Sequence, residues 1–294
     1  MTEMADSLHT ETTVDEMLVK SIIDIGIPPR PAILDVLARE VRTGEPDFKR
    51  ITQHVSADVS LSAGLIKTAN SPFFGFRVRA KTVAHALTML GLEIATKALA
   101  GIALRNAFPV TPALERFWDS SACIAEFSGC LVEIVGGRQH VQADDAYTYG
   151  LFRDCGIPVL MRKFPHYKDV LARANREKHR RFTAVEEDDL PTNHAIVGCM
   201  LAQSWSLPEE ICQAIRHHHD FTLMQTGGPT MPSASQRLIA IGQLAEHLHQ
   251  MDTGMSYTQE WLKLGPASLG VLQLQDSDLD DLLGEIKLRS KERW

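Results

Sequence analysis

The sequence is poor in aromatic residues and in cysteine. Aromatic side chains make up 6% of its 294 residues, and its five cysteines are odd in number and include no C-x-x-C pair. This usage excludes a disulfide framework and a zinc ribbon and is typical of a reduced intracellular protein. Basic residues are also few, since 30 Lys and Arg stand against 37 Asp and Glu, which gives a formal charge of −7. We therefore expect no DNA partner, because phosphate binding requires a basic surface.

The sequence also lacks a long apolar run. A membrane-spanning helix needs about 18 or more uninterrupted apolar residues. The nearest candidate, residues 83–104, is interrupted by His85, Glu93 and Lys97 and is expected to form buried helices. Residues 1–16 are polar and acidic, without the apolar core of a signal peptide. We expect a cytoplasmic protein with no membrane partner.

Apolar residues recur at helical spacing along most of the chain, which predicts an all-α protein because no βαβ alternation is present. The only strand-like alternation, residues 74–80, has no pairing partner and is expected to be a loop. Residues 109–112 form a joint between an N-terminal helical subdomain, residues 14–108, and a helical bundle, residues 112–294. The expected helices are 14–25, 31–44, 47–55, 58–70, 82–90, 92–108, 112–135, 143–164, 167–178, 192–206, 208–219, 234–251, 257–264 and 277–289.

Histidines and one carboxylate form the best candidate for a chemical site. They are Asp154, His194 near the start of a predicted helix, and His218 and His219 at the end of another. Such groups from different helices of a bundle can converge on a divalent metal, which would activate a bound water against a phosphoester. Alternatively, the helix dipole alone favours histidines at a helix C-terminus, and Asp154 could bond to backbone in a turn. Both interpretations are open at this point.

Two blocks of sequence carry the motifs of a known family. The first contains Ile-Pro-Pro-Arg-Pro at 27–31, Asn-Ser-Pro at 70–72 and Ala-Leu-Thr-Met-Leu-Gly at 86–91. The second contains Trp-Ser-Leu-Pro at 205–208, followed by three histidines at 217–219. In their order and spacing these motifs resemble the HDOD family, signalling output domains related to HD-type metal phosphohydrolases, over roughly residues 15–220. The resemblance implies an N-terminal helical HDOD subdomain packed on an HD-like helical bundle.

The resemblance also implies a metal site that this chain retains only in part. HD enzymes hold metal with an early histidine, a His-Asp doublet and a late aspartate. Here residues 117–121 contain no histidine, Arg153 takes the imidazole position of the doublet, and Gln243 is the nearest counterpart of the late aspartate. Because an arginine cannot lose its proton to bind a metal, we expect Arg153 to pair with Asp154 and fill the vacated space.

The ligands that remain are Asp154 and histidines. His194 and His218 or His219 resemble the additional histidines of the HD-GYP branch. A degenerate site formed by these four residues would hold a divalent ion of iron, manganese, zinc or nickel. Without such a site, no cofactor is expected.

The function implied by the resemblance is regulatory. We expect a stand-alone, non-catalytic bacterial signal-transduction module that acts through protein–protein contacts with separately encoded signalling proteins. Two alternatives are open. One is a metal-dependent phosphohydrolase acting on a nucleotide or cyclic dinucleotide, and the other is a sensor of cyclic di-GMP or another nucleotide.

Two basic segments are candidate contact surfaces for a partner or a nucleotide. The first is the loop that follows Asn70 and contains Phe76, Arg77 and Arg79. The second is the run 173–181, whose arginines are Arg173, Arg176, Arg180 and Arg181. Its cations suit an acidic partner or a phosphate, although the solvated end of a helix carries the same pattern and no interleaved aromatics support base stacking.

Overall fold

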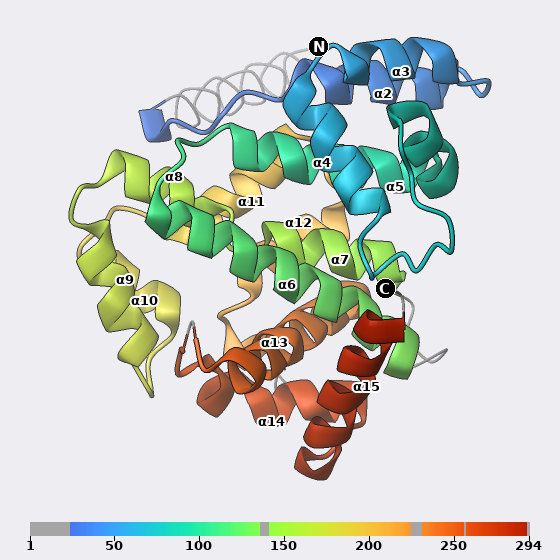
Figure 1. Ribbon diagram of the computed structural model, residues 1–294. Helices are drawn as coiled ribbons and strands as arrows, with labels where there is room; N and C mark the ends of the chain where they lie inside the picture. Colours follow the sequence, from blue (N-terminus) through green and yellow to red (C-terminus); the bar gives the residue numbers. More distant parts are fainter. Residues whose placement is uncertain (1–23, 136–140, 225–230, 256, 293–294) are drawn as a thin grey trace, which may run out of the picture.

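All regular secondary structure in the described part of the chain is helical. The computed structural model describes residues 24–135, 141–224, 231–255 and 257–292 (Figure 1). Its helices are α2 (Ala32–Arg42), α3 (Phe48–Ser56), α4 (Val59–Ala69), α5 (Val83–Asn106), α6 (Pro112–Val135), α7 (Ala143–Phe152), α8 (Gly156–Lys163), α9 (Tyr167–Arg176), α10 (Phe182–Glu187), α11 (His194–Ser204), α12 (Glu209–His217), α13 (Ser233–Thr253), α14 (Glu260–Leu272) and α15 (Leu279–Glu292), with 3-10 turns at Phe221–Met224 and Asp276–Asp278. Residues 74–80 form a loop. The all-α prediction is confirmed, while most of the helix expected at 14–25 lies outside the described residues.

Side-chain caps explain why several helices begin where the sequence predicts. The carboxylates of Asp47 and Asp58 and the amide oxygen of Asn193 accept hydrogen bonds from backbone N–H groups of the following turn at 2.8–3.0 Å. Each cap satisfies donors that the first turn of a helix leaves without a partner. The starts of α3, α4 and α11 therefore fall within two residues of the predicted positions.

Helix α5 is both long and largely apolar. It is the one helix in the described ranges that is long and apolar enough to cross a membrane, but half of its most apolar 18-residue stretch is buried inside the protein. Gly91 interrupts it with a φ of 72°, a left-handed conformation that glycine adopts without steric cost. Both features are those of a core helix of a folded bundle.

One apolar core joins the N-terminal helices to the rest of the protein. Its fully buried members include Leu37 of α2, Leu99 of α5, Phe152 of α7 and Leu244 of α13. In Figure 1, α2–α5 lie above α6 and α7, and α13 and α14 lie below them. The N-terminal helices and the bundle therefore share a single core.

The prediction of one helix over residues 143–164 is wrong. Helix α7 ends at Phe152 and α8 begins at Gly156. Pro158 is buried and has no N–H to donate to the carbonyl of Asp154, four residues earlier, so a continuous helix would leave that carbonyl without its helical partner. Proline is tolerated instead in the first turn of α8. The break leaves Arg153 and Asp154 at the junction of two helices.

The C-terminal helix expected at 257–264 is also displaced. Helix α14 begins at Glu260 and continues through Pro266 to Leu272. Because Pro266 has no N–H, the carbonyl of Leu262, four residues earlier, loses its helical hydrogen bond. Both residues are exposed, so water can donate to that carbonyl instead. A proline on the solvent side therefore does not end this helix.

The packing of α8 against α11 depends on a glycine. A Cβ at Gly156 would lie 2.0 Å from the carbonyl oxygen of His194 and 2.8 Å from the backbone nitrogen of Gly198. Because backbone atoms of a packed helix cannot rotate away, Gly156→Ala is expected to lower the free energy of unfolding by about 3 kcal/mol. Urea denaturation measures this change. Gly284→Ala is the control, because no heavy atom lies within 4 Å of a Cβ there, and equal midpoints for the two variants would contradict the prediction.

Candidate metal centre

The four predicted ligands lie together. Their ligand atoms are all within 4.8 Å of one another, although Asp154 follows α7, His194 opens α11, and His218 and His219 follow one another at the end of α12. Asp154 Oδ1 lies 3.5 Å from His194 Nε2 and 3.3 Å from His218 Nε2. His194 Nε2 lies 3.2 Å from His218 Nε2 and 3.1 Å from His219 Nε2. For ligands about 2.1 Å from a tetrahedral ion, simple geometry gives separations of about 3.4 Å.

The hydrogen bonds of the three imidazoles orient their lone pairs toward the same point. His218 Nδ1 lies 2.8 Å from the carbonyl oxygen of Ile215, which only accepts, so this nitrogen carries the proton. His194 Nδ1 and His219 Nδ1 likewise lie 2.7 Å and 2.6 Å from carboxylate oxygens. The Nε2 atoms are then left with lone pairs that face one another at 3.1–3.2 Å. Such an arrangement is repulsive unless a proton or a metal ion lies between them.

Two glutamates hold the histidines and were not predicted from the sequence. Glu186, on α10, accepts from His194 Nδ1 and from the hydroxyl of Tyr167. Glu260, at the start of α14, accepts from His219 Nδ1 and forms an ion pair with Lys263. Carboxylates in this position fix the tautomer of a metal-binding histidine and raise its basicity. Helix α10 has only six residues, too few to show a helical period, and Glu260 is 41 residues from its histidine, so no local signal marked either one.

The buried charges around the cluster do not balance. Four carboxylates lie here with at most 19% of each side chain exposed, against two buried cations: Asp154, Glu186, Glu246 and Glu260, with Arg153 and Lys263. With His194 neutral, as a metal ligand must be, four negative and two positive charges leave an excess of two negative charges. Buried charge is costly unless it is paired. A divalent cation held by the four ligands would cancel this excess, so the residues present fit such an ion.

The pKa values of the ligands follow the same electrostatics. Burial by itself would raise the pKa of Asp154, but the Arg153 guanidinium and hydrogen bonds from His194 and His218 outweigh it and hold that pKa well below the ordinary value. Burial would lower the pKa of His194, but Glu186 and Asp154 raise it to about 10, so without an ion His194 holds a proton that a bound metal would displace. Burial lowers the pKa of His218 and His219, which are therefore neutral and able to donate lone pairs to a metal.

Arg153 forms the ion pair with Asp154 that the sequence predicts. Its Nε donates to Asp154 Oδ2 at 3.0 Å, one terminal nitrogen donates to the carbonyl of Gly242 at 3.0 Å, and the other donates to Glu246 Oε2 at 2.8 Å. The guanidinium is buried and all three of its nitrogens are used. Gln243 lies beside it, with its amide 3.5 Å from the same Glu246 oxygen. The acidic group that faces Arg153 from α13 is thus Glu246, one turn beyond Gln243.

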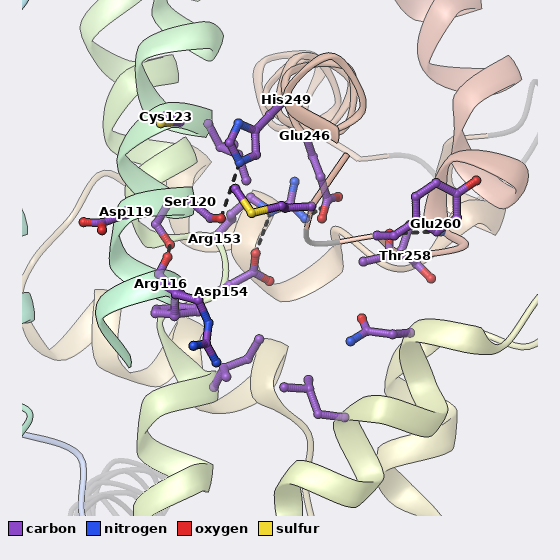
Figure 2. Close-up of a pocket in the computed structure, with 18 of the residues that line it drawn as sticks. Arg116, Asp119, Ser120, Cys123, Arg153, Asp154, Glu246, His249, Thr258 and Glu260 are labelled. Carbon is purple, nitrogen blue, oxygen red and sulfur yellow. Dashed lines mark hydrogen bonds and ion pairs between the residues drawn. The ribbon is translucent and has the colours of Figure 1, made fainter. Parts of the chain in front are cut away.

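The cluster opens on one side into a cleft. Asp154 and His219 line a cavity of about 750 Å³ between α6, α8, α9, α13 and α14, whereas His194 and His218 are not among its lining residues. Figure 2 shows residues of α6, such as Arg116 and Ser120, on one wall and Glu260 and Thr258 on another, with Asp154 between them. A small molecule could reach the cluster from this cleft.

Most arginines of the predicted basic contact run have acidic partners. Arg173 forms an ion pair with Asp189, Arg180 donates two hydrogen bonds to Asp188 at 2.8 and 2.9 Å, and Arg181 donates to Asp220 at 3.0 Å. Arg176 is exposed on the last turn of α9. Because nearby carboxylates offset these charges, the run presents less positive potential to a nucleotide or an acidic partner than its sequence suggests.

The second predicted contact segment is a loop held at both ends. Phe76 is 39% exposed and stacks on Phe74, with ring centroids 6.2 Å apart, and Arg77 and Arg79 are exposed beside it. The side chain of Asn70 donates to the carbonyl of Ala80 at 2.9 Å and accepts from its N–H at 2.8 Å. Asn70 therefore closes the loop, while Phe76, Arg77 and Arg79 lie on the protein surface.

The double hydrogen bond of Asn70 predicts a measurable effect on stability. Asn70→Ala would leave the N–H and the carbonyl of the buried Ala80 without partners, at a cost of about 2 kcal/mol. The midpoint of urea unfolding measures it. Asn106→Ala is the matched control, because the side chain of Asn106 accepts one hydrogen bond from an exposed serine and its loss should change stability by less than about 0.5 kcal/mol. If both variants unfold alike, Asn70 does not hold the loop.

A comparison with protein-family models decides the family. The model of the HDOD domain matches residues 27–221, which is more than half of the chain. The chain belongs to the HDOD family. Two solved structures share the fold of this HDOD protein over nearly their whole length. A "putative phosphohydrolase" from Shewanella amazonensis SB2B has a TM-score of 0.66 at 18% identity, with 94% of this chain and 96% of that chain covered. An HDOD domain protein with unknown function from Geobacter sulfurreducens has a TM-score of 0.64 at 21% identity, with 95% and 97% covered.

A curated relative is longer than this chain. An uncharacterized protein of Treponema pallidum (strain Nichols) is 25% identical over 214 residues, which make up 72% of this chain and 41% of that protein. The chain thus spans less than half the length of that relative. At these identities the solved structures show the fold alone, and the function must be argued from the residues of the site.

Proposed function

We propose that this HDOD protein is a regulatory module of a cytoplasmic bacterial signalling system that holds one divalent metal ion and acts by binding rather than by turnover. The single observation that carries the metal centre is the convergence of three imidazole Nε2 atoms and the Asp154 carboxylate. Imidazole and carboxylate ligands suit zinc, iron, manganese or nickel. Its signalling partner would be a separately encoded protein.

Two features of the ligand set favour binding over catalysis. Four protein ligands complete the coordination of a tetrahedral ion, as in structural zinc sites, whereas catalytic zinc sites keep a position for water. Arg153 adds a permanent cation next to Asp154, where a second metal ligand stands in HD enzymes. The centre would then tie α7, α11 and α12 together and make the shape of the protein depend on the metal.

Phosphoester hydrolysis is the second candidate. The observation in its favour is the cleft, which reaches two of the four ligands, Asp154 and His219. A metal bound there supplies a Lewis acid and lowers the pKa of a coordinated water. An ion that prefers six ligands would have room for water and substrate on this side.

Metal analysis with a matched set of variants tests the proposal. The purified, untagged protein is expected to contain about one equivalent of a transition metal by plasma mass spectrometry, and Asp154→Ala and His194→Ala are expected to contain none. His54→Ala, at an exposed position on α3, is the control and should retain the metal. A metal-free wild-type protein after growth in metal-supplemented medium would contradict the metal centre.

A turnover assay separates the two candidates. The metal-loaded protein is expected not to hydrolyse bis(p-nitrophenyl) phosphate with zinc, iron, manganese or nickel. Hydrolysis that a chelator abolishes and that His194→Ala lacks would overturn the non-catalytic role and establish the phosphohydrolase.

A further inference from the structure

We propose that the cleft over the metal centre binds a small organic anion, with its charged group between the metal-bearing floor and Arg116 and its apolar body along α8 and α9. The inference rests on the proposed metal centre, because the ion sets the charge of the cleft floor. It adds a ligand class and a recognition residue, Arg116, to that function.

The charges that line the cleft single out Arg116. On the floor, a divalent ion together with Arg153 and Lys263 balances the four buried carboxylates. On the α6 wall, Asp119 faces Arg105 at 3.5 Å. Arg116 is exposed, lines the cleft, and has no hydrogen bond or ion pair with any residue in the described part of the chain. With the ion bound, the unbalanced charge of the cleft is therefore this one guanidinium.

A guanidinium suits an anionic group of defined geometry. Its planar fork matches two oxygens of a carboxylate or a phosphoryl group, and such charge-assisted bonds are stronger than neutral ones. Figure 2 places Arg116 on the α6 side of the cleft, and Asp154 lines the same cleft. An anion bound by Arg116 would share the cleft with Asp154, and a metal held there would also attract it by its positive charge.

The rest of the cleft suits an apolar body. Ile157 and Met161 of α8 and Leu171 of α9 form one wall, and Phe182 closes the floor, with its ring stacked on His219 at a centroid distance of 4.5 Å and an angle of 13°. The volume of about 750 Å³ lies within the range of small-molecule sites. A ligand that is anionic at one end and aromatic or aliphatic at the other would satisfy both parts of this lining.

Calorimetric titration of the zinc-loaded full chain tests the inference. The probes are phenylphosphonate and benzoate, which present the two kinds of anionic group and cannot be hydrolysed, and methylphosphonate, which lacks the apolar body. We expect at least one aromatic probe to bind, and phenylphosphonate to bind more tightly than methylphosphonate. Arg116→Gln is expected to weaken the aromatic probe about tenfold or more, the loss of one charged contact, while the metal content stays unchanged.

Arg42→Gln is the matched control, because Arg42 is exposed on α2 and does not line the cleft. This variant should bind the aromatic probe with the same affinity as the wild type. Zinc-loaded protein that binds no probe at millimolar concentration, or that binds equally well with Arg116→Gln, would overturn the anion site and leave the metal centre standing. A protein that takes up no metal would instead contradict the proposed function, which the metal analysis reports separately.

Discussion

Asp154→Asn is expected to abolish the stabilisation that zinc confers on the protein. Because the four ligands come from three segments far apart in the chain, the unfolded chain holds no comparable site, and metal binding adds directly to the free energy of unfolding. Zinc at 100 to 1,000 times its dissociation constant should add about 3–4 kcal/mol to the wild type and nothing to the variant. Urea unfolding with zinc and with a chelator measures both values.

The asparagine is chosen so that loss of metal is not confused with loss of fold. It has the shape of aspartate, and its oxygen can still accept the hydrogen bond from Arg153 Nε. Glu186→Gln is expected to have a smaller effect than Asp154→Asn, because it keeps a hydrogen-bond acceptor for His194 Nδ1 and removes only the charge. It should weaken zinc binding about 10–100-fold. Zinc that stabilises Asp154→Asn as strongly as the wild type would show that the ion binds elsewhere.

The second large effect is expected at Arg153. Arg153→Met would leave the buried carboxylate of Glu246 without its cation, and removing one partner of a buried ion pair costs about 3–5 kcal/mol. Burial already raises the pKa of Glu246, with Arg153 opposing the shift, so the cation is what keeps this carboxylate charged. The midpoint of urea unfolding at neutral pH measures the loss.

Two further variants test whether the pair, and not the arginine alone, is responsible. The double variant with Arg153→Met and Glu246→Leu should recover much of the stability, because an apolar pair of similar volume replaces a buried ion pair at little cost. Arg289→Met removes a partly exposed arginine paired with Glu133 and Glu285 and should cost less than about 1 kcal/mol. If Arg153→Met were no more destabilising than Arg289→Met, Arg153 would not be essential to the core.

Helix positions followed well from the sequence where the signals were local. The predicted bounds of α6 agree with the structure at both ends, and Asp47 and Asp58 act as caps beside the predicted starts of α3 and α4. The error at 143–164 has a local cause as well, since Pro158 and Gly156 already stand in the sequence. Apolar residues nevertheless recur across that break, because both helices contribute buried residues to the protein interior.

The candidate metal centre could be predicted only in part. Its four candidate ligands were named from the sequence because histidine and aspartate carry recognisable chemistry and stand in family motifs. The carboxylates that orient and balance them were not named. Glu186 and Glu260 reach His194 and His219 from α10 and α14, and Glu246 reaches Arg153 from α13.

By itself the sequence determined the helical class, most helix boundaries and the identity of the four candidate ligands, because caps, prolines and apolar periodicity act over a few neighbouring residues. Only the tertiary structure decided which of the 37 acidic residues surround the histidines and which arginines are already paired. It also showed that Arg116 lines a cleft and has no ion-pair partner among the described residues. These choices depend on how helices far apart in the chain pack against one another. Each pairing depends on how deeply the two side chains are buried and how far apart they lie. Neither quantity can be read from the type of a single residue or from its neighbours in the sequence.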